Sequence, residues 1–583
     1  MRTFLLSLAG AFVALIAFNV LALLLFSVIL SSASGDDAQP DNLILTLDLR
    51  SPLPDMAPSQ GLAAFSGENG FVDTITKLHA AADDPNVKGL FLRGPEFGIG
   101  SSRAEELRDA IRKLQASGKY VTAHSQGNFA TGPSGLRAIA AADETWIQPG
   151  SDLMVSGVSF ETLFLGKLFE NLSIVPEIEA FYEYKNAPNT YKETDYTEPH
   201  REAMTALASS IWSTSLKDIA EDRDMTKADL RALLESGPMD ADRTIETGIM
   251  DKLGWPEDAQ FAAQTRDGKG NLLTIANYTP PSVSARAKQI AVIGGEGAII
   301  TGSESGGPFG GENGFSSDTI AKAILDAGNN SRVEAIVFRV DSPGGSPSAS
   351  DQIWRAVERV QEMDKPVVVS MGSAAASGGY YVSTGADYIF ASASTITGSI
   401  GIFGGKATIS GGLERIGVNP RTITVGGEFS DAYGVDPFTE SQKQHVFESL
   451  KRGYDRFTSL VAEGRELPLD EVNKIARGRV WSGSDALERG LVDEIGGFID
   501  AVEKAKELAG IDTEDDVRLV YYPKRKTGFE ALDDLFGTSS EVAKAATVIG
   551  AIAGDERLDA ALTQMKLLQT QRAQVAAPII IER

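Results

Sequence analysis

The chain contains an internal repeat whose two copies are each large enough to be a domain. The segment Gly67–Phe71 (GENGF) recurs unchanged as Gly311–Phe315. Three further pairs of segments match in the same order: Asp84–Arg93 with Asn330–Arg339, Arg108–Gln115 with the run ending at Arg355–Gln361, and Gly248–Gly254 with Gly490–Gly496. A period this long far exceeds the roughly 20–50 residues of a solenoid repeat. The sequence therefore predicts two homologous domains, here called the first and the second repeat.

Both repeats show the same alternation of strands and helices. Leu43–Leu49 and Gln289–Ile293 are the expected opening strands, and a loop rich in Gly, Pro and Ser follows each. An amphipathic helix, a buried strand, a second helix and another strand come next. These later strands are expected at 89–93 and 120–123 in the first repeat, and at 335–340 and 366–370 in the second. Such alternation indicates an α/β fold with largely parallel sheets. Tyr278–Ser284, with two prolines, is the expected linker between the repeats.

The N-terminal segment predicts a membrane anchor. Residues 4–30 carry no charge and are almost wholly apolar. At 1.5 Å per residue such a helix exceeds the roughly 30 Å hydrocarbon core, so one tilted helix spans it. Arg2 precedes the segment and acidic residues follow it, which favours a cytoplasmic N-terminus and an exported body. The alternative is a cleaved signal peptide, although the apolar region of such a peptide is usually only about 7–15 residues long.

Composition excludes several function classes. The net charge is −26, so the surface repels phosphate backbones and nucleic-acid binding is not expected. The chain has no cysteine and only four scattered histidines, which excludes thiolate catalysis and makes a histidine metal site improbable.

The repeats differ at a glycine-rich loop after the buried strand. The second repeat has Asp341–Ser346 (DSPGGS), whose paired glycines Gly344 and Gly345 allow backbone N–H groups to approach an oxyanion closely. The first repeat has Gly94–Gly98 (GPEFG) instead. The alternative interpretation of DSPGGS is an ordinary strand-to-helix turn.

A serine follows the next strand of the second repeat. Ser377 begins an expected helix of small residues, so the N–H group of Gly378 would lie beside an oxyanion formed on this serine's substrate. A serine at such a position is more commonly a helix N-cap. In the first repeat Ser377 aligns with Pro133, and Ser134 lies one place away.

A lysine shows the opposite difference. Lys185 of the first repeat aligns with Ser430 of the second, and its neighbours Tyr182 and Tyr184 are aromatic groups able to keep water from it. Without that context, a lysine is usually a solvated surface charge.

Together these segments resemble the long form of the signal peptide peptidase A (protease IV) family, membrane-bound peptidases with a Ser/Lys dyad. The resemblance covers roughly residues 40–525. Its motifs are DSPGGS, the segment around Ser377, Thr397–Ile402 and Tyr184–Ala187. Asn186 stands where the family more often has serine. Short relatives place the lysine at the position of Ser430, which explains why this chain would need Lys185 from the other repeat.

The resemblance implies the roles of the site residues. Ser377 is the expected nucleophile, Lys185 the general base and Ser399 the residue that orients the lysine. Gly345 and Gly378, with Gly344 beside them, are expected to bind the oxyanion. Lys406 is the next candidate base. No metal and no cofactor are expected. A neutral lysine would require burial that lowers its pKa by several units.

The resemblance also implies the architecture and the setting. We expect two tandem Clp protease/crotonase-like domains (ββα repeats) preceded by one transmembrane helix. The expected parts are an anchor with a short linker (1–40), the repeat supplying the lysine (41–285), the repeat supplying the serine (286–527) and a helical extension (528–583). The expected location is the bacterial inner membrane, with the catalytic body on the periplasmic side. The expected partners are the bilayer through residues 4–30, other subunits in a tetramer, and hydrophobic peptides such as signal peptide remnants.

Two other function classes remain open from the sequence. One is a crotonase-like enzyme acting on acyl-CoA, which would use the same glycine N–H groups to stabilise a thioester enolate. The other is a non-catalytic membrane scaffold of the same fold.

Overall fold

The computed structural model describes residues 39–57, 69–303, 315–512, 515–523 and 575–576. The expected membrane segment and most of the expected C-terminal extension lie outside these residues. Among the helices in the described ranges, none is long and apolar enough to cross a bilayer. These helices and the strands between them belong to one unit, which begins at Leu43.

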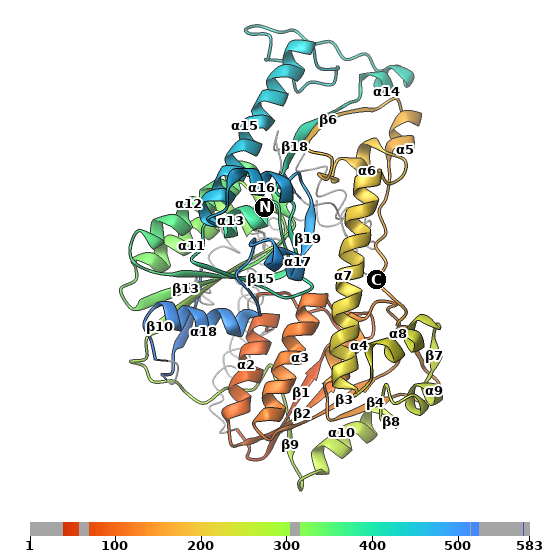
Figure 1. Cartoon of the computed structure of the whole chain (residues 1–583). Coiled ribbons are helices and arrows are strands. Elements are labelled where there is room, and N and C mark those ends of the chain that lie inside the picture. The colour runs from red at the N-terminus through yellow and green to blue at the C-terminus, as the bar shows by residue number, and fades with distance from the viewer. Residues whose placement is uncertain (1–38, 58–68, 304–314, 513–514, 524–574, 577–583) are drawn as a thin grey trace, which may run out of the picture. The chain divides into compact units, whose positions relative to one another are not determined.

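The first repeat forms a six-stranded parallel sheet (Figure 1). Its strands, in spatial order, are β8 (Lys252–Leu253), β4 (Glu144–Ile147), β3 (Tyr120–Ser125), β2 (Val87–Arg93), β1 (Leu43–Asp48) and β9 (Asn271–Thr274). Its main helices are α2 (Phe71–Asp83), α3 (Ser101–Ala116), α4 (Ser134–Ala140), α7 (Glu198–Asp222), α8 (Lys227–Glu235), α9 (Ala241–Glu246) and α10 (Pro256–Thr265). Two short strands, β5 (Asp152–Leu153) and β7 (Met239–Asp240), pair separately.

The second repeat builds the same order of strands. The parallel series is β20 (Glu494–Ile495), β16 (Tyr388–Ala391), β15 (Val367–Ala376), β13 (Val333–Ser342), β10 (Gln289–Glu296) and β21 (Arg518–Tyr522). Its main helices are α11 (Ser317–Asn329), α12 (Pro347–Gln361), α13 (Gly378–Ser383), α15 (Glu440–Gly464), α16 (Leu469–Ile475), α17 (Gly483–Glu488) and α18 (Phe498–Leu508). Each strand in this series has the same place in the sheet as its counterpart in the first repeat. The topology of the two sheets therefore agrees with the internal repeat in the sequence.

The second sheet extends further at the carboxyl end of β15. Beyond the end of its pairing with β16, β15 pairs with β17 (Ile396–Gly398), which pairs antiparallel with β19 (Val480–Ser482). A separate small sheet has the order β12 (Phe315–Ser316), β11 (Ile299–Ile300), β14 (Gly344–Gly345) and β22 (Val575–Ala576). The strand β14 is the glycine pair predicted from the DSPGGS motif.

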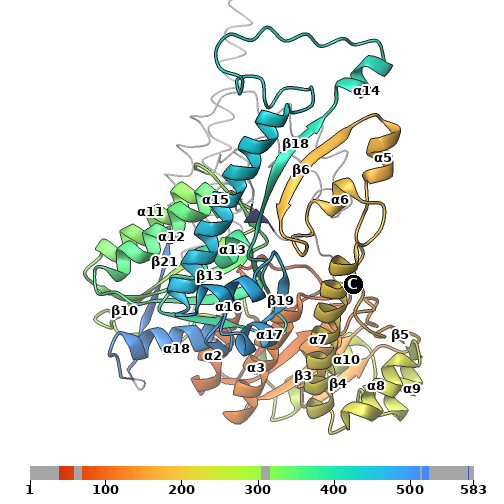
Figure 2. The ribbon, with the colours of Figure 1, turned by 45° about the horizontal axis from the view of Figure 1, so that its top comes forward.

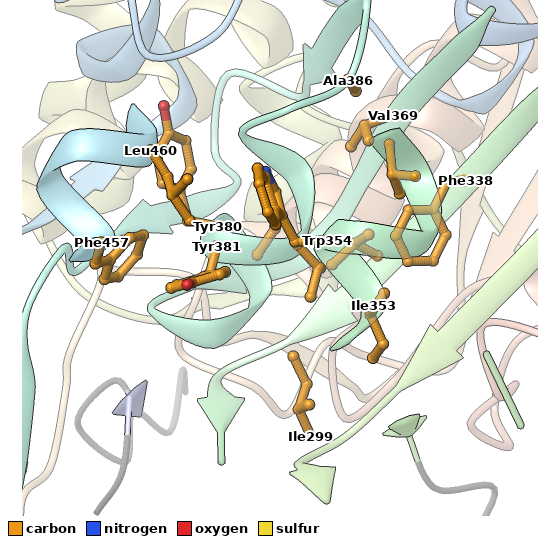
Figure 3. Packing of buried hydrophobic residues seen from close by; sticks show 14 of the residues in the cluster. Ile299, Phe338, Ile353, Trp354, Val369, Tyr380, Tyr381, Ala386, Phe457 and Leu460 are labelled. Carbon is orange, nitrogen blue, oxygen red and sulfur yellow. The ribbon is translucent and has the colours of Figure 1, made fainter. Parts of the chain in front are cut away.

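The strands are buried because their sequences are apolar on both faces. In β13 the residues Ala335–Phe338 are fully buried, as expected for a central parallel strand covered by helices on each side. Figure 3 shows Tyr380 and Tyr381 of α13 close to Trp354 of α12 and to Phe457 of α15. The ring centroids of Tyr381 and Phe457 are 4.8 Å apart. This packing fixes the helix that begins directly after Ser377.

An antiparallel ribbon joins the two repeats. Strand β6 (Val175–Phe181) of the first repeat pairs along its whole length with β18 (Ile402–Thr408) of the second, from Phe181↔Ile402 to Val175↔Thr408. The two strands lie side by side in Figures 1 and 2. The short helices α5 (Gly166–Asn171), α6 (Asn189–Lys192) and α14 (Ser410–Arg415) lie near this ribbon in the sequence. Because Phe181 pairs with Ile402, the segment that follows Phe181 begins next to the start of β18.

The expected linker is partly core. Tyr278 is buried, and its hydroxyl donates a hydrogen bond to Asp84 of the first repeat at 2.9 Å. The first residue of the predicted linker is therefore part of the first repeat's core, because its aromatic ring lies in the buried apolar cluster of that repeat. Residues 279–284 have no regular structure.

Candidate active site

Ser377 lies between the end of β15 and the start of α13, as the sequence predicts. It is fully buried and has a positive φ of 56°, a conformation that a residue with a side chain adopts only when its surroundings enforce it. Its N–H group donates to the carbonyl of Gly398 at 2.7 Å. Its side chain makes no capping hydrogen bond to α13. Ser377 is therefore the N-cap residue of α13 by position only, and its hydroxyl is available for another partner.

That partner is Lys185. The lysine Nζ lies 2.7 Å from Ser377 Oγ, 2.9 Å from the carbonyl oxygen of Ser399 and 3.0 Å from Ser399 Oγ. Lys185 is 2% exposed, so it is not the solvated surface charge that a lone lysine usually is. Burial lowers the pKa of its amine well below the usual range.

The hydrogen-bond geometry suits a neutral amine. A neutral amine has two N–H donors and one lone pair, and Ser399 offers two acceptors, its carbonyl and its hydroxyl oxygen. The Ser399 hydroxyl in turn lies 3.4 Å from the carbonyl of Gly478, to which it donates. With both N–H groups directed at Ser399, the lone pair of Lys185 faces the Ser377 hydroxyl. A neutral Nζ at this distance accepts the Ser377 O–H, whereas a charged one donates to Ser377 Oγ, so only the neutral form gives the arrangement needed for proton removal.

The glycine pair lies next to the serine. A Cβ placed on Gly378 would be 3.0 Å from the Gly345 nitrogen and 3.1 Å from the Gly344 Cα, so the start of α13 and β14 approach closely only because residue 378 has no side chain. Residue 345 is equally constrained, since a Cβ there would overlap the carbonyl of Ile299. The structure thus brings Gly344, Gly345 and Gly378 together beside Ser377.

An extended segment already pairs with this glycine strand. Strand β22 runs antiparallel to β14, with Gly344 opposite Ala576 and Gly345 opposite Val575. It lies on the side of β14 opposite β11. The edge of β14 therefore pairs with an antiparallel strand in the same part of the structure as Ser377.

The equivalent region of the first repeat is filled. Glu96 of the GPEFG loop is buried and accepts hydrogen bonds from Ser125 Oγ at 3.0 Å and from the Gln126 N–H at 2.7 Å. The cavity beside it measures only about 10 Å³. Ser134 is buried at the start of α4, where its hydroxyl accepts from the Ile99 N–H at 3.4 Å. The first repeat keeps the fold of the site but leaves no space for a substrate.

The alternative lysine is engaged elsewhere. Lys406 donates to the carbonyl oxygens of Ala432 at 2.7 Å and Gly434 at 3.2 Å, and lies over the ring of Phe438. Ser430, the position of the lysine in short relatives, is exposed. Neither is part of the Ser377 site.

Sequence reasoning missed the segment Arg477–Arg479. Its glycine, Gly478, packs against the backbone of Lys185. A glycine shortly after a short helix is typical of an ordinary helix end. The arginine on each side of Gly478 is the only local feature that differs from that pattern.

Comparison with known proteins places the chain in a family. The model of peptidase family S49 matches residues 113–268 and 359–512, one segment in each repeat. Protease 4 of Haemophilus influenzae is 31% identical over 75% of this chain and 72% of its own length. Protease 4 of Salmonella typhi is 32% identical over 76% of this chain and 72% of its own. The chloroplastic serine protease SPPA of Arabidopsis thaliana is 27% identical over 92% and 80%. With a family segment in each half and relatives aligned over three quarters of its length, the chain belongs to peptidase family S49 and is a serine peptidase.

Proposed function

We propose that this serine peptidase is a membrane-anchored endopeptidase that cleaves short hydrophobic peptides, such as signal peptide remnants, through a Ser377/Lys185 dyad. The observation that carries the proposal is the 2.7 Å separation of Lys185 Nζ and Ser377 Oγ, with the amine buried. A lysine in this position argues against a non-catalytic scaffold, because a buried amine is costly to keep without a function.

The proposed reaction begins with attack on a peptide carbonyl. The Ser377 oxygen bonds to the carbonyl carbon while its proton moves to the lone pair of Lys185. The negative charge that develops on the carbonyl oxygen is stabilised by the N–H groups of Gly345 and Gly378, where loss of one such donor typically costs about 3–4 kcal/mol. Gly344 shapes the same loop.

The leaving amine then takes the proton from Lys185, and the C–N bond breaks to leave an ester on Ser377. Water attacks this ester, its proton returns through Lys185 to the Ser377 oxygen, and the acid product departs. Throughout, Ser399 holds the amine through two hydrogen bonds. No metal or organic cofactor enters the proposed reaction.

The pairing of β14 with β22 supports a peptide as the substrate. An extended chain beside β14 places its backbone against Gly344 and Gly345, the recognition mode of proteins that add a strand to a sheet edge. The apolar residues 4–30 support a bilayer anchor, and with it a bacterial inner-membrane location with the catalytic body on the outer side.

We also propose the domain division: an anchor with a short linker (1–40), two Clp protease/crotonase-like domains (41–285 and 286–527) and a C-terminal extension (528–583). Assembly of the chain into a tetramer is a further part of the proposal. The loop after α14 supports subunit contact, because Ile416, Ile423 and Val425 are 74%, 94% and 90% exposed. Apolar side chains exposed together in one loop are typical of surfaces that another subunit covers. Light scattering of the detergent-solubilised chain tests the assembly.

The dyad assignment is tested by two substitutions. Ser377→Ala is expected to abolish hydrolysis of a hydrophobic fluorogenic peptide and labelling by a fluorophosphonate, with the fold intact. Lys185→Ala is expected to abolish hydrolysis as well, because the amine it removes is the one hydrogen-bonded to Ser377, and Lys406, the next candidate base, is bound to the Ala432 carbonyl instead. The matched control is Ser134→Ala, in the filled site of the first repeat, which is expected to keep wild-type turnover. Wild-type turnover in Lys185→Ala would refute the base assignment.

A further inference from the structure

The backbone of the segment Arg477–Arg479 connects the Lys185 segment of the first repeat with Ser399 of the second. It lies between α16 and β19 in the second repeat. The carbonyl of Arg477 accepts from the Tyr182 N–H at 3.4 Å, on the lysine segment of the first repeat. The carbonyl of Arg479 accepts from the Ser399 N–H at 2.7 Å. The backbone of these three residues is thus hydrogen-bonded both to the segment that contains Lys185 and to Ser399, the residue proposed to orient the lysine.

The middle residue packs directly on the lysine. Gly478 has a φ of +83°, and a Cβ placed on it would lie 2.5 Å from the Cα and the Cβ of Lys185. Real atoms do not approach so closely, so any side chain at 478 would displace the lysine backbone. Because Ser399 Oγ donates to the Gly478 carbonyl at 3.4 Å, the same residue also contacts the group that holds the amine.

The two arginine side chains hold the residues that directly precede the lysine, and one of them also binds α7. Arg477 forms two hydrogen bonds of 2.9 Å with Glu183 and lies 4.9 Å from the ring centre of Tyr182. Arg479 lies 4.9 Å from the ring centre of Tyr184 and binds Glu202 through two hydrogen bonds of 2.7 Å. All four partners belong to the first repeat, whereas both arginines belong to the second. Planar guanidinium groups suit this combination of paired carboxylate bonds and ring stacking.

We propose that Arg477, Gly478 and Arg479 are positioning residues that hold the Lys185 segment of the first repeat against Ser399, so that the amine reaches the Ser377 hydroxyl. The inference rests on the proposed dyad. These three residues do not touch the reacting atoms, and they act by fixing where the lysine lies and how dry its surroundings are. A base displaced by about 1 Å can lose on the order of 100-fold in rate.

The first test is Gly478→Ala, measured with the full-length chain in detergent and a hydrophobic fluorogenic peptide. We expect kcat to fall by about 100-fold, because the new methyl group displaces Lys185. The matched control is Gly417→Ala. Gly417 has nearly the same φ, +81°, but open space where a Cβ would lie, so this variant carries the same backbone strain without the clash. It is expected to stay within about twofold of wild type.

The second test is the double variant Arg477→Gln/Arg479→Gln, with the pH dependence of kcat as the readout. Activity requires the neutral amine, so the rate falls as the pH drops through the pKa of Lys185. Looser packing admits water and weakens the desolvation that lowers this pKa, so the acid limb is expected to move up by at least about half a pH unit. Arg489→Gln is the control, since Arg489 lies over the ring of Trp481, as Arg479 does, but binds Asp485 rather than the lysine segment.

The outcomes separate this inference from the dyad itself. If Gly478→Ala loses no more activity than Gly417→Ala, or if the double variant keeps the wild-type acid limb, the positioning role is overturned while the dyad stands. If Gly478→Ala does not fold, the acid limb of the double variant decides. If Lys185→Ala itself retains activity, the proposed dyad fails, and a shifted limb would then have another origin.

Discussion

At the scale of single residues, the proposed chemistry depends on one amine being uncharged. At a reference pKa of about 10.4, only about one lysine in 2,500 is neutral at pH 7. Lys185 is fully buried, and the three oxygens within hydrogen-bond distance of its nitrogen are all uncharged. Burial therefore favours the neutral form, and Ser399 supplies acceptors for its two N–H groups.

The same burial predicts how stability changes with pH. Lys185→Met is expected to raise the free energy of unfolding near neutral pH, because a thioether of similar size needs no deprotonation. The folded-state pKa of Lys185 lies below its unfolded value of about 10.4. Between these two values the unfolded chain binds more protons than the folded chain, so wild-type stability rises by about 1.4 kcal/mol per pH unit. The advantage of the variant should therefore shrink as pH rises toward 10.4.

Denaturant unfolding of wild type and Lys185→Met at a series of pH values measures this difference. A stability difference that does not change with pH would show that the lysine is already charged in the folded state.

The proposed catalytic residues differ in how far the sequence could predict them. Ser377, Gly345 and Gly378 follow from local patterns, because a strand end, a glycine pair and a small-residue helix start are contiguous in the chain. Lys185 emerged only from comparing the two repeats and from a family resemblance. Its distance to Ser377 could not be predicted, because the two residues are 192 positions apart and meet through tertiary structure. The contact of Gly478 with Lys185 is equally non-local, and no local sequence pattern predicts it.

At the scale of elements, the sequence predicts where the central strands lie but not their full length. The opening strands and the strands at 89–93, 120–123, 335–340 and 366–370 each overlap an observed strand, but most observed strands are longer, and β15 ends at Ala376, six residues beyond the predicted end. Apolar runs bounded by turn residues give this result locally. The β6–β18 ribbon and the β14–β22 pair were not predicted, because pairing partners between distant segments leave no periodic signal in either strand.

The β14–β22 pair predicts an effect of the C-terminal segment. Since Val575–Ala576 lies where an extended substrate would pair, deleting residues 575–583 is expected to lower KM for a peptide and leave kcat unchanged. A competing strand reduces apparent substrate affinity in proportion to its occupancy. Steady-state kinetics of the full-length and shortened chains measures the change. An unchanged KM, or a loss of kcat, would show that this strand does not compete with substrate.

At the scale of the whole molecule, buried charges hold the repeats together. Arg339 of the second repeat is fully buried and binds two carboxylates of the first, Asp55 at 2.8 Å and Glu106 at 2.8 Å. A second buried arginine, Arg137, donates to Ser394 of the other repeat at 3.0 Å. The site lies between the repeats, so these contacts also hold the dyad together.

Removing the central cation should therefore affect both stability and activity. Arg339→Ala is expected to lower the free energy of unfolding by about 3–5 kcal/mol, because two buried carboxylates lose their partner. The control is Arg355→Ala, which removes two exposed ion pairs, with Glu358 and Glu362, and should change the free energy of unfolding far less. Urea unfolding followed by tryptophan fluorescence measures both. Equal effects of the two substitutions would show that Arg339 does not link the repeats.

The division of the dyad between the repeats has a consequence for synthesis on the ribosome. Lys185 is translated first, Ser377 follows 192 residues later, and the glycine that packs on the lysine comes later still. A nascent chain therefore holds the proposed base without the proposed nucleophile for much of its elongation. With the proposed dyad, hydrolytic capacity arises only once the second half has folded against the first, which protects the unfinished polypeptide from premature cleavage.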